Sequence, residues 1–83
     1  MNKFIKVLIT EDCILKLKEY QIEKQYIKAK EYILSWFLNN VDFKKRRPYK
    51  TDKYYFRINK KYRAICYIEN NIVNVFEIDD HQD

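Results

Sequence analysis

The fold is decided by residues 53–79, which read KYYFRINKKYRAICYIENNIVNVFEID. This stretch contains three runs rich in aromatic and β-branched residues, the types most common in strands. The runs are interrupted at Asn59–Lys61 and at Asn70–Asn71, and asparagine is a favoured turn residue. The sequence therefore predicts three consecutive strands joined by short turns, over residues 53–59, 62–69 and 72–79.

Alternation along these strands separates two arginines from the apolar residues. Arg57 falls on the face opposite Phe56, and Arg63 on the face opposite Ala64 and Cys66. If the apolar faces pack inward, both arginines point to the open face of the sheet. The chain's only histidine, His81, follows the third strand.

Arginine binds phosphate through its charge and paired donors, and an imidazole moves a proton near neutral pH. We therefore place a candidate site for a phosphoester at Arg57, Arg63 and His81. The alternative is that the arginines pair with acids such as Glu77 or Asp79, and that the histidine is an ordinary surface residue.

Upstream of residue 53, the pattern changes from strand to helix. Residues 4–9 form a short apolar run that predicts a first strand, and Thr10 followed by two acids is typical of a helix start. An apolar stripe with helical spacing then predicts a second helix that ends at Asn39–Asn40. The members of this stripe are Ile22, Tyr26, Ala29, Ile33 and Phe37.

A single helix over residues 11–39 would be about 43 Å long. A domain of this size has a radius of gyration of only about 12 Å. We therefore expect a helical hairpin with its break at Tyr20–Glu23. The predicted fold is a single α+β domain over residues 1–83, with element order β-α-α-β-β-β and the hairpin on one face of a small antiparallel sheet.

The net charge of +5 is concentrated in one part of the chain. Residues 44–63, called the basic segment below, contain ten Lys and Arg residues and a single acid, Asp52. This concentration favours a polyanionic partner, either nucleic acid or an acidic protein. The alternative is a solvated basic loop. The candidate residues for contact with such a partner, RNA included, are Arg46, Arg47, Lys50, Lys53, Lys60 and Lys61.

Cysteine and histidine usage excludes several classes of site. Cys13 and Cys66 lie far apart within apolar patterns, which predicts buried free thiols in a reducing compartment. One histidine cannot form a Cys/His cluster with metal-ligand spacing, so we expect no metal and no cofactor. With no signal peptide and no run of 18 apolar residues, we expect a cytoplasmic protein that does not enter a membrane.

The chain also resembles a known family. Residues 55–65, read together with residues 77–81, resemble the RelE/ParE superfamily of toxins from type II toxin–antitoxin systems. The shared features are a basic residue on the second strand, a Tyr-Arg pair that opens the third and a histidine after the fourth. The predicted element order matches that family over nearly the whole chain.

The resemblance implies one of two activities. RelE-like members are metal-free endoribonucleases that cut mRNA on the ribosome, whereas ParE-like members inhibit DNA gyrase by binding it. In the first case, Arg63 would stabilise the scissile phosphate, Arg57 would assist it, and His81 would act as general acid or base. Lys50 and Lys53 would help to hold the RNA.

The resemblance also implies a cognate antitoxin protein as partner. We expect a small protein with an acidic or amphipathic segment that folds on the toxin and neutralises its basic surface. A plain RNA- or DNA-binding module is the remaining alternative.

Overall fold

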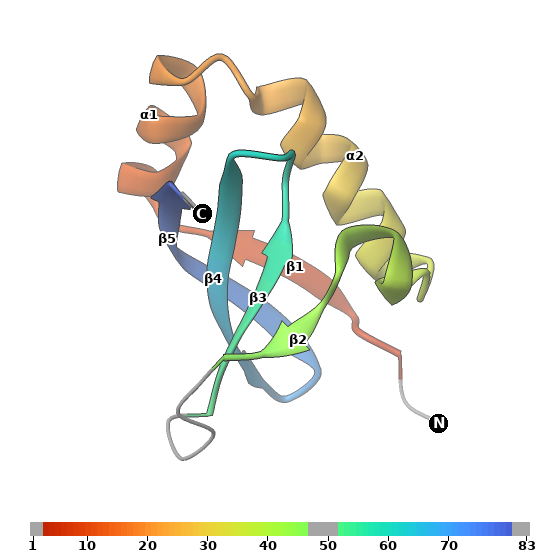
Figure 1. Ribbon diagram of the computed structural model, residues 1–83. Coiled ribbons are helices and arrows are strands. Elements are labelled where there is room, and N and C mark those ends of the chain that lie inside the picture. The colour runs from red at the N-terminus through yellow and green to blue at the C-terminus, as the bar shows by residue number, and fades with distance from the viewer. Residues whose placement is uncertain (1–2, 47–51, 81–83) are drawn as a thin grey trace.

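The computed structural model describes residues 3–46 and 52–80. Two helices cover one face of a five-stranded sheet (Figure 1). In chain order the elements are β1 (Lys6–Ile9), α1 (Glu11–Glu19), α2 (Glu23–Leu34), a 3-10 helix η1 (Leu38–Val41), β2 (Lys44–Lys45), β3 (Lys53–Arg57), β4 (Tyr62–Glu69) and β5 (Ile72–Asp80). The predicted α+β class, with a helical hairpin on one face of the sheet, is confirmed.

The sheet has the strand order β1-β5-β4-β3-β2. Strands β3 to β5 are antiparallel, as expected, and β2 adds to β3 in the same sense, but β1 pairs with β5 in parallel. The strand β2 was not predicted, because it consists of only Lys44 and Lys45 at the sheet edge.

Both helices end in the same way, with a left-handed residue that is not glycine. After α1, Gln21 has φ 58° and the Ile22 amide donates to the Leu17 carbonyl at 3.0 Å. After α2, Trp36 has φ 66° and the Phe37 amide donates to the Tyr32 carbonyl at 2.8 Å. These bonds define Schellman motifs, which satisfy the last carbonyls of a helix.

The predicted break at Tyr20–Glu23 is confirmed, whereas the predicted end of the second helix was wrong. Helix α2 ends at Leu34, and Asn39 and Asn40 belong to η1. The left-handed turn at Trp36 also removes Phe37 from the apolar stripe, so that its side chain is 58% exposed. The other members of the stripe are buried.

The hairpin between β4 and β5 turns on two asparagines. Asn70 has φ 53° and Asn71 has φ 63°, the left-handed values that a two-residue hairpin turn requires. Asparagine tolerates this conformation better than most residues, which explains how a chain without glycine makes the turn.

The core lies between the helices and the sheet. Phe56 on β3 is fully buried there and contacts the rings of Tyr26 and Phe43, at centroid distances of 6.3 Å each. Cys13 and Cys66 are buried free thiols, as predicted, and burial raises the pKa of Cys66 to about 12. In the described part of the chain, neither helix combines the length and apolar character that crossing a bilayer requires.

The Tyr26 hydroxyl is a weak point of this core. It is buried without a hydrogen-bond partner among the described residues, and burial raises the pKa of Tyr26 above its ordinary value. An unpaired buried hydroxyl lowers the stability of the folded state by about 1–3 kcal/mol.

We expect Tyr26→Phe to increase the free energy of unfolding by about 1 kcal/mol in urea titrations. Tyr32→Phe, at a half-buried position on the same helix, is the control; a loss of stability in Tyr26→Phe alone would show that the hydroxyl is satisfied.

Candidate functional site

The face of the sheet opposite the helices displays cross-strand rows of side chains. In the first row, Asp79 on β5, Arg63 on β4 and Arg57 on β3 are direct neighbours. The middle row contains Glu77, Ile65, Tyr55 and Lys44, and the third contains Leu8, Asn74, Tyr67 and Lys53. Residues in such rows project from the same face of the sheet. We call this surface the open face.

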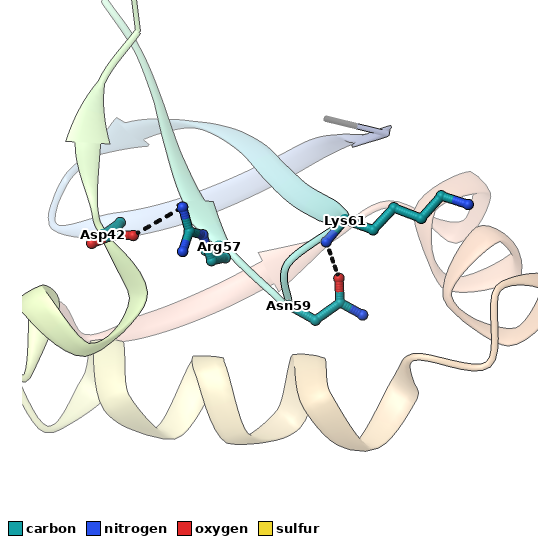
Figure 2. A network of polar contacts seen from close by, with 4 residues as sticks. All are labelled: Asp42, Arg57, Asn59 and Lys61. Carbon is teal, nitrogen blue, oxygen red and sulfur yellow. Dashed lines mark hydrogen bonds and ion pairs between the residues drawn. The ribbon is translucent and has the colours of Figure 1, made fainter. Parts of the chain in front are cut away.

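The two arginines of the first row face each other directly across β3 and β4. Like charges at such positions destabilise a sheet unless something compensates them. Here an acid lies at each end of the row: Arg63 pairs with Asp79 at 3.3 Å, and Arg57 pairs with Asp42 at 3.4 Å (Figure 2). The structure therefore brings Arg57 and Arg63 together, with one carboxylate for each guanidinium.

Arg63 is held from two sides. Its terminal nitrogen donates to Asp79, and its guanidinium carbon lies 4.7 Å from the centre of the Tyr55 ring. The side chain is 21% exposed, and its Nε is buried with no hydrogen-bond partner among the described residues. Arg63 is thus held in place by an ion pair on one side and an aromatic ring on the other.

Arg57 is freer than Arg63, since its side chain is 51% exposed. Its partner Asp42 follows η1 and has a left-handed backbone with φ 50°. Nothing in the sequence pattern predicted this ion pair, because Asp42 comes to the edge of β3 only through the unexpected 3-10 helix. The alternative that strand arginines pair with acids is confirmed for Arg63 and Asp79.

The turn between β3 and β4 carries two further cations. The Asn59 side-chain oxygen accepts a hydrogen bond from the Lys61 backbone amide at 2.8 Å (Figure 2). It also accepts one from the Tyr62 amide at 2.8 Å, and the two bonds fix the turn. The Lys61 amine lies 5.4 Å from the centre of the Tyr62 ring. Lys60 lines a hollow of about 390 Å³ between α2 and the end of β3. Both lysines follow Arg57 closely along the chain.

Lys53 and Arg46 lie at the opposite end of β3. The Arg46 amide donates to the Lys53 carbonyl at 2.7 Å, and the Lys53 amine lies 5.6 Å from the centre of the Phe76 ring. On the described residues, the cations of the basic segment therefore lie along the whole of β3, with Lys44 beside Tyr55 at its middle and the others toward its two ends. Acids lie among the cations of the first row.

Three predicted site residues, Arg47, Lys50 and His81, lie outside the described residues. Their roles stay predictions. The part of the chain that is described contains no group of three or more His, Cys, Asp and Glu side chains that could hold a metal ion.

The sequence interpretation missed two residues of the site, Asp42 and Tyr55. Alternation already placed Tyr55 on the same face as Arg57, so the pairing of β3 with β4 would have put it diagonally next to Arg63. The alternation of residues on β3 was therefore a usable signal for Tyr55. The sequence contains no comparable signal for Asp42.

Comparison with known proteins gives a likeness in fold. No family model matches the chain, and no curated protein matches it. Among solved structures, a chain of the YoeB-YefM complex from Staphylococcus aureus superposes with a TM-score of 0.62 and 17% sequence identity. The superposition covers 98% of this chain and 100% of that chain. At this identity, the likeness shows that the two chains share a fold.

Proposed function

We propose that the chain is the toxin of a type II toxin–antitoxin pair and that it cleaves mRNA as a ribosome-dependent, metal-free endoribonuclease. The observation on which this proposal depends is the arginine pair on the open face, in which Arg63 is fixed by Asp79 and Tyr55. The shared fold with a chain of the YoeB-YefM complex supports the same proposal.

In the proposed reaction, the 2′-hydroxyl of one nucleotide attacks the adjacent phosphate. The bond to the 5′-oxygen of the next nucleotide breaks, which leaves a cyclic phosphate and a free 5′-hydroxyl. Negative charge increases on the phosphoryl oxygens in the transition state, and Arg63, assisted by Arg57, offsets it. Fixed donors aimed at developing charge usually provide the largest part of catalysis.

His81 is the proposed proton donor to the leaving oxygen, or the acceptor of the hydroxyl proton. An imidazole with a pKa near 6.5 suits both roles. Its position supports this assignment, because it comes directly after Asp80, the last residue of β5, and two residues after Asp79, the partner of Arg63. The lysines Lys50, Lys53, Lys60 and Lys61, with Arg46 and Arg47, are proposed to bind the RNA backbone.

A second candidate function is inhibition of DNA gyrase by binding alone. Exposed apolar side chains on the helices favour it, namely Leu15 on α1 and Ile27 on α2. Such residues on a small domain offer a surface for a protein partner. The acids at both ends of the arginine row are also compatible with a structural role for that row.

One experiment separates the two functions. The protein is induced in cells, the 5′ ends of mRNA are mapped, and a DNA-damage reporter is followed in the same culture. The nuclease produces new 5′ ends within translated codons and no damage signal, and His81→Ala suppresses these ends. A damage signal with intact mRNA would overturn the proposal in favour of gyrase inhibition.

The proposed partner is an antitoxin encoded next to this chain. Co-expression of the adjacent reading frame, followed by pull-down and growth measurement, tests it. We expect a stable complex and relief of growth arrest, and we expect salt to slow the association because the cations steer an acidic partner. A chain that is harmless on its own and captures no neighbour-encoded protein would contradict both the partner and the toxin assignment.

A further inference from the structure

Two aromatic rings lie side by side on the open face, away from the arginines. Tyr67 on β4 and Phe76 on β5 have ring centroids 5.9 Å apart and an angle of 42° between their planes. Tyr67 is 43% exposed, and Phe76 is half-buried. An exposed pair of large rings on a sheet that is otherwise well packed suggests a contact surface.

The backbone of β5 is irregular at this pair. Ile65 pairs with Glu77, but the next residue of β4, Cys66, pairs with Val75, so that Phe76 is the extra residue of a β-bulge. Bulges of this kind often occur next to functional sites, where they change the direction of a side chain. Here the bulge leaves Phe76 without a cross-strand partner, next to Tyr67.

Hollows lie beside the two rings. One has a volume of about 380 Å³ and is lined by Lys53, Tyr67, Ile68 and Phe76, together with Asp52. Another, of about 150 Å³, lies toward β1 and is lined in part by Leu8 and Asn74. Tyr67 and Phe76 line both hollows, so a flat ligand in either one would contact an aromatic ring.

Cations lie close to these rings. The Lys53 amine is 5.6 Å from the centre of the Phe76 ring, on the side of the larger hollow. Arg63 is on the same strand as Tyr67, four residues earlier, which corresponds to about 13 Å along β4. A ligand that contacts both places must therefore be extended and negatively charged, and it must also offer a flat apolar group.

We infer that Tyr67 and Phe76 form a stacking platform for an unpaired base of single-stranded RNA, whose backbone runs toward the arginine row. This inference rests on the proposed function and identifies the part of the RNA that this end of the open face contacts. A base fits the flat, apolar hollow, and Lys53 lies where it can approach a neighbouring phosphate. Stacking of this kind accepts any base, since every base has a flat π-surface.

The test is a titration of the full, isotope-labelled chain, followed through the ring protons of Tyr67 and Phe76 by NMR. The probes are a decamer of adenosines, the same decamer with abasic sugars, and a decaglutamate peptide. The intact RNA is expected to shift both rings strongly, while the abasic strand and the peptide shift the signals of the Lys and Arg side chains and move the two rings much less. Ring currents from a stacked base cause such shifts, and weak complexes remain visible.

Substitutions distinguish stacking of a base on an aromatic ring from contact of the base with any apolar side chain. Tyr67→Leu keeps an apolar side chain but removes the ring, and we expect it to weaken binding of the adenosine decamer by about tenfold. Tyr67→Phe keeps the ring and is expected to bind within about twofold of the parent chain. Ile27→Ala, at an exposed position on α2, is the matched control and should leave the affinity unchanged.

Rings that do not respond to RNA, or that respond equally to the abasic strand or the peptide, would overturn the inference; a response to the peptide would indicate a protein partner instead. The proposed function is judged separately, by the mapping of mRNA ends. Cleavage that persists unchanged in Tyr67→Leu refutes the platform alone. Base-dependent ring shifts without any cleavage in cells support the platform and refute the nuclease.

Discussion

Arg63→Ala is expected to reduce the rate of mRNA cleavage by about 100- to 1,000-fold, the usual cost of removing one fixed donor from a developing negative charge. Arg63 is the best oriented cation of the open face, because Asp79 and the Tyr55 ring hold its guanidinium. The rate is measured by primer extension on mRNA bound to ribosomes. Arg63→Lys retains the charge without the planar fork of donors, so its rate should fall between the two.

Two controls accompany this prediction. Lys16→Ala removes an exposed cation from α1 and should cleave at the parent rate. Circular dichroism should show that Arg63→Ala remains folded, because Asp79 is partly exposed and water can solvate its carboxylate. Cleavage at the parent rate by a folded Arg63→Ala protein would show that Arg63 is not part of the proposed site.

Phe56→Ala should remove a large part of the free energy of unfolding of the protein at room temperature. Truncation of a fully buried phenylalanine costs about 3–5 kcal/mol, and a domain of this length has a total stability of only about 4–12 kcal/mol. Phe56 contacts both Tyr26 on α2 and Phe43 next to β2, so the loss affects the whole core. Urea titration measures the effect.

The matched control is Phe37→Ala. The same side chain is removed, but at a position that is 58% exposed, and we expect a change of no more than about 0.5 kcal/mol. Equal losses from the two variants would show that Phe56 is not central to the core.

The strands and their faces could be predicted from the sequence because alternation is a local property. Phe56 and Ala64 are buried and Arg57 is exposed, as their positions within each run require. The two arginines could be placed together for the same reason, since a short turn fixes which residues of β3 and β4 face each other. The break between the two helices could be predicted because a single helix over residues 11–39 would be too long for a domain of this size.

Features that depend on distant parts of the chain could not be predicted in this way. The parallel pairing of β1 with β5, the short strand β2 and the ion pair of Asp42 with Arg57 all require the folded arrangement of several elements. The end of α2 was missed because Trp36 takes a left-handed conformation that is unusual for a bulky residue. The bulge at Phe76 has no glycine or proline to mark it.

The pairing of β1 with β5 has a consequence for the order in which the protein forms. Strands β3, β4 and β5 are joined by short turns and can meet within a small part of the chain, whereas β1 must wait for a strand made much later. During synthesis on the ribosome, β1 emerges well before its partner, with most of the other elements between them. Contacts that span such long separations slow folding, and local ones form first. The sheet is therefore completed at its β1 edge only after β5 has been synthesised, so the finished open face cannot exist before that point.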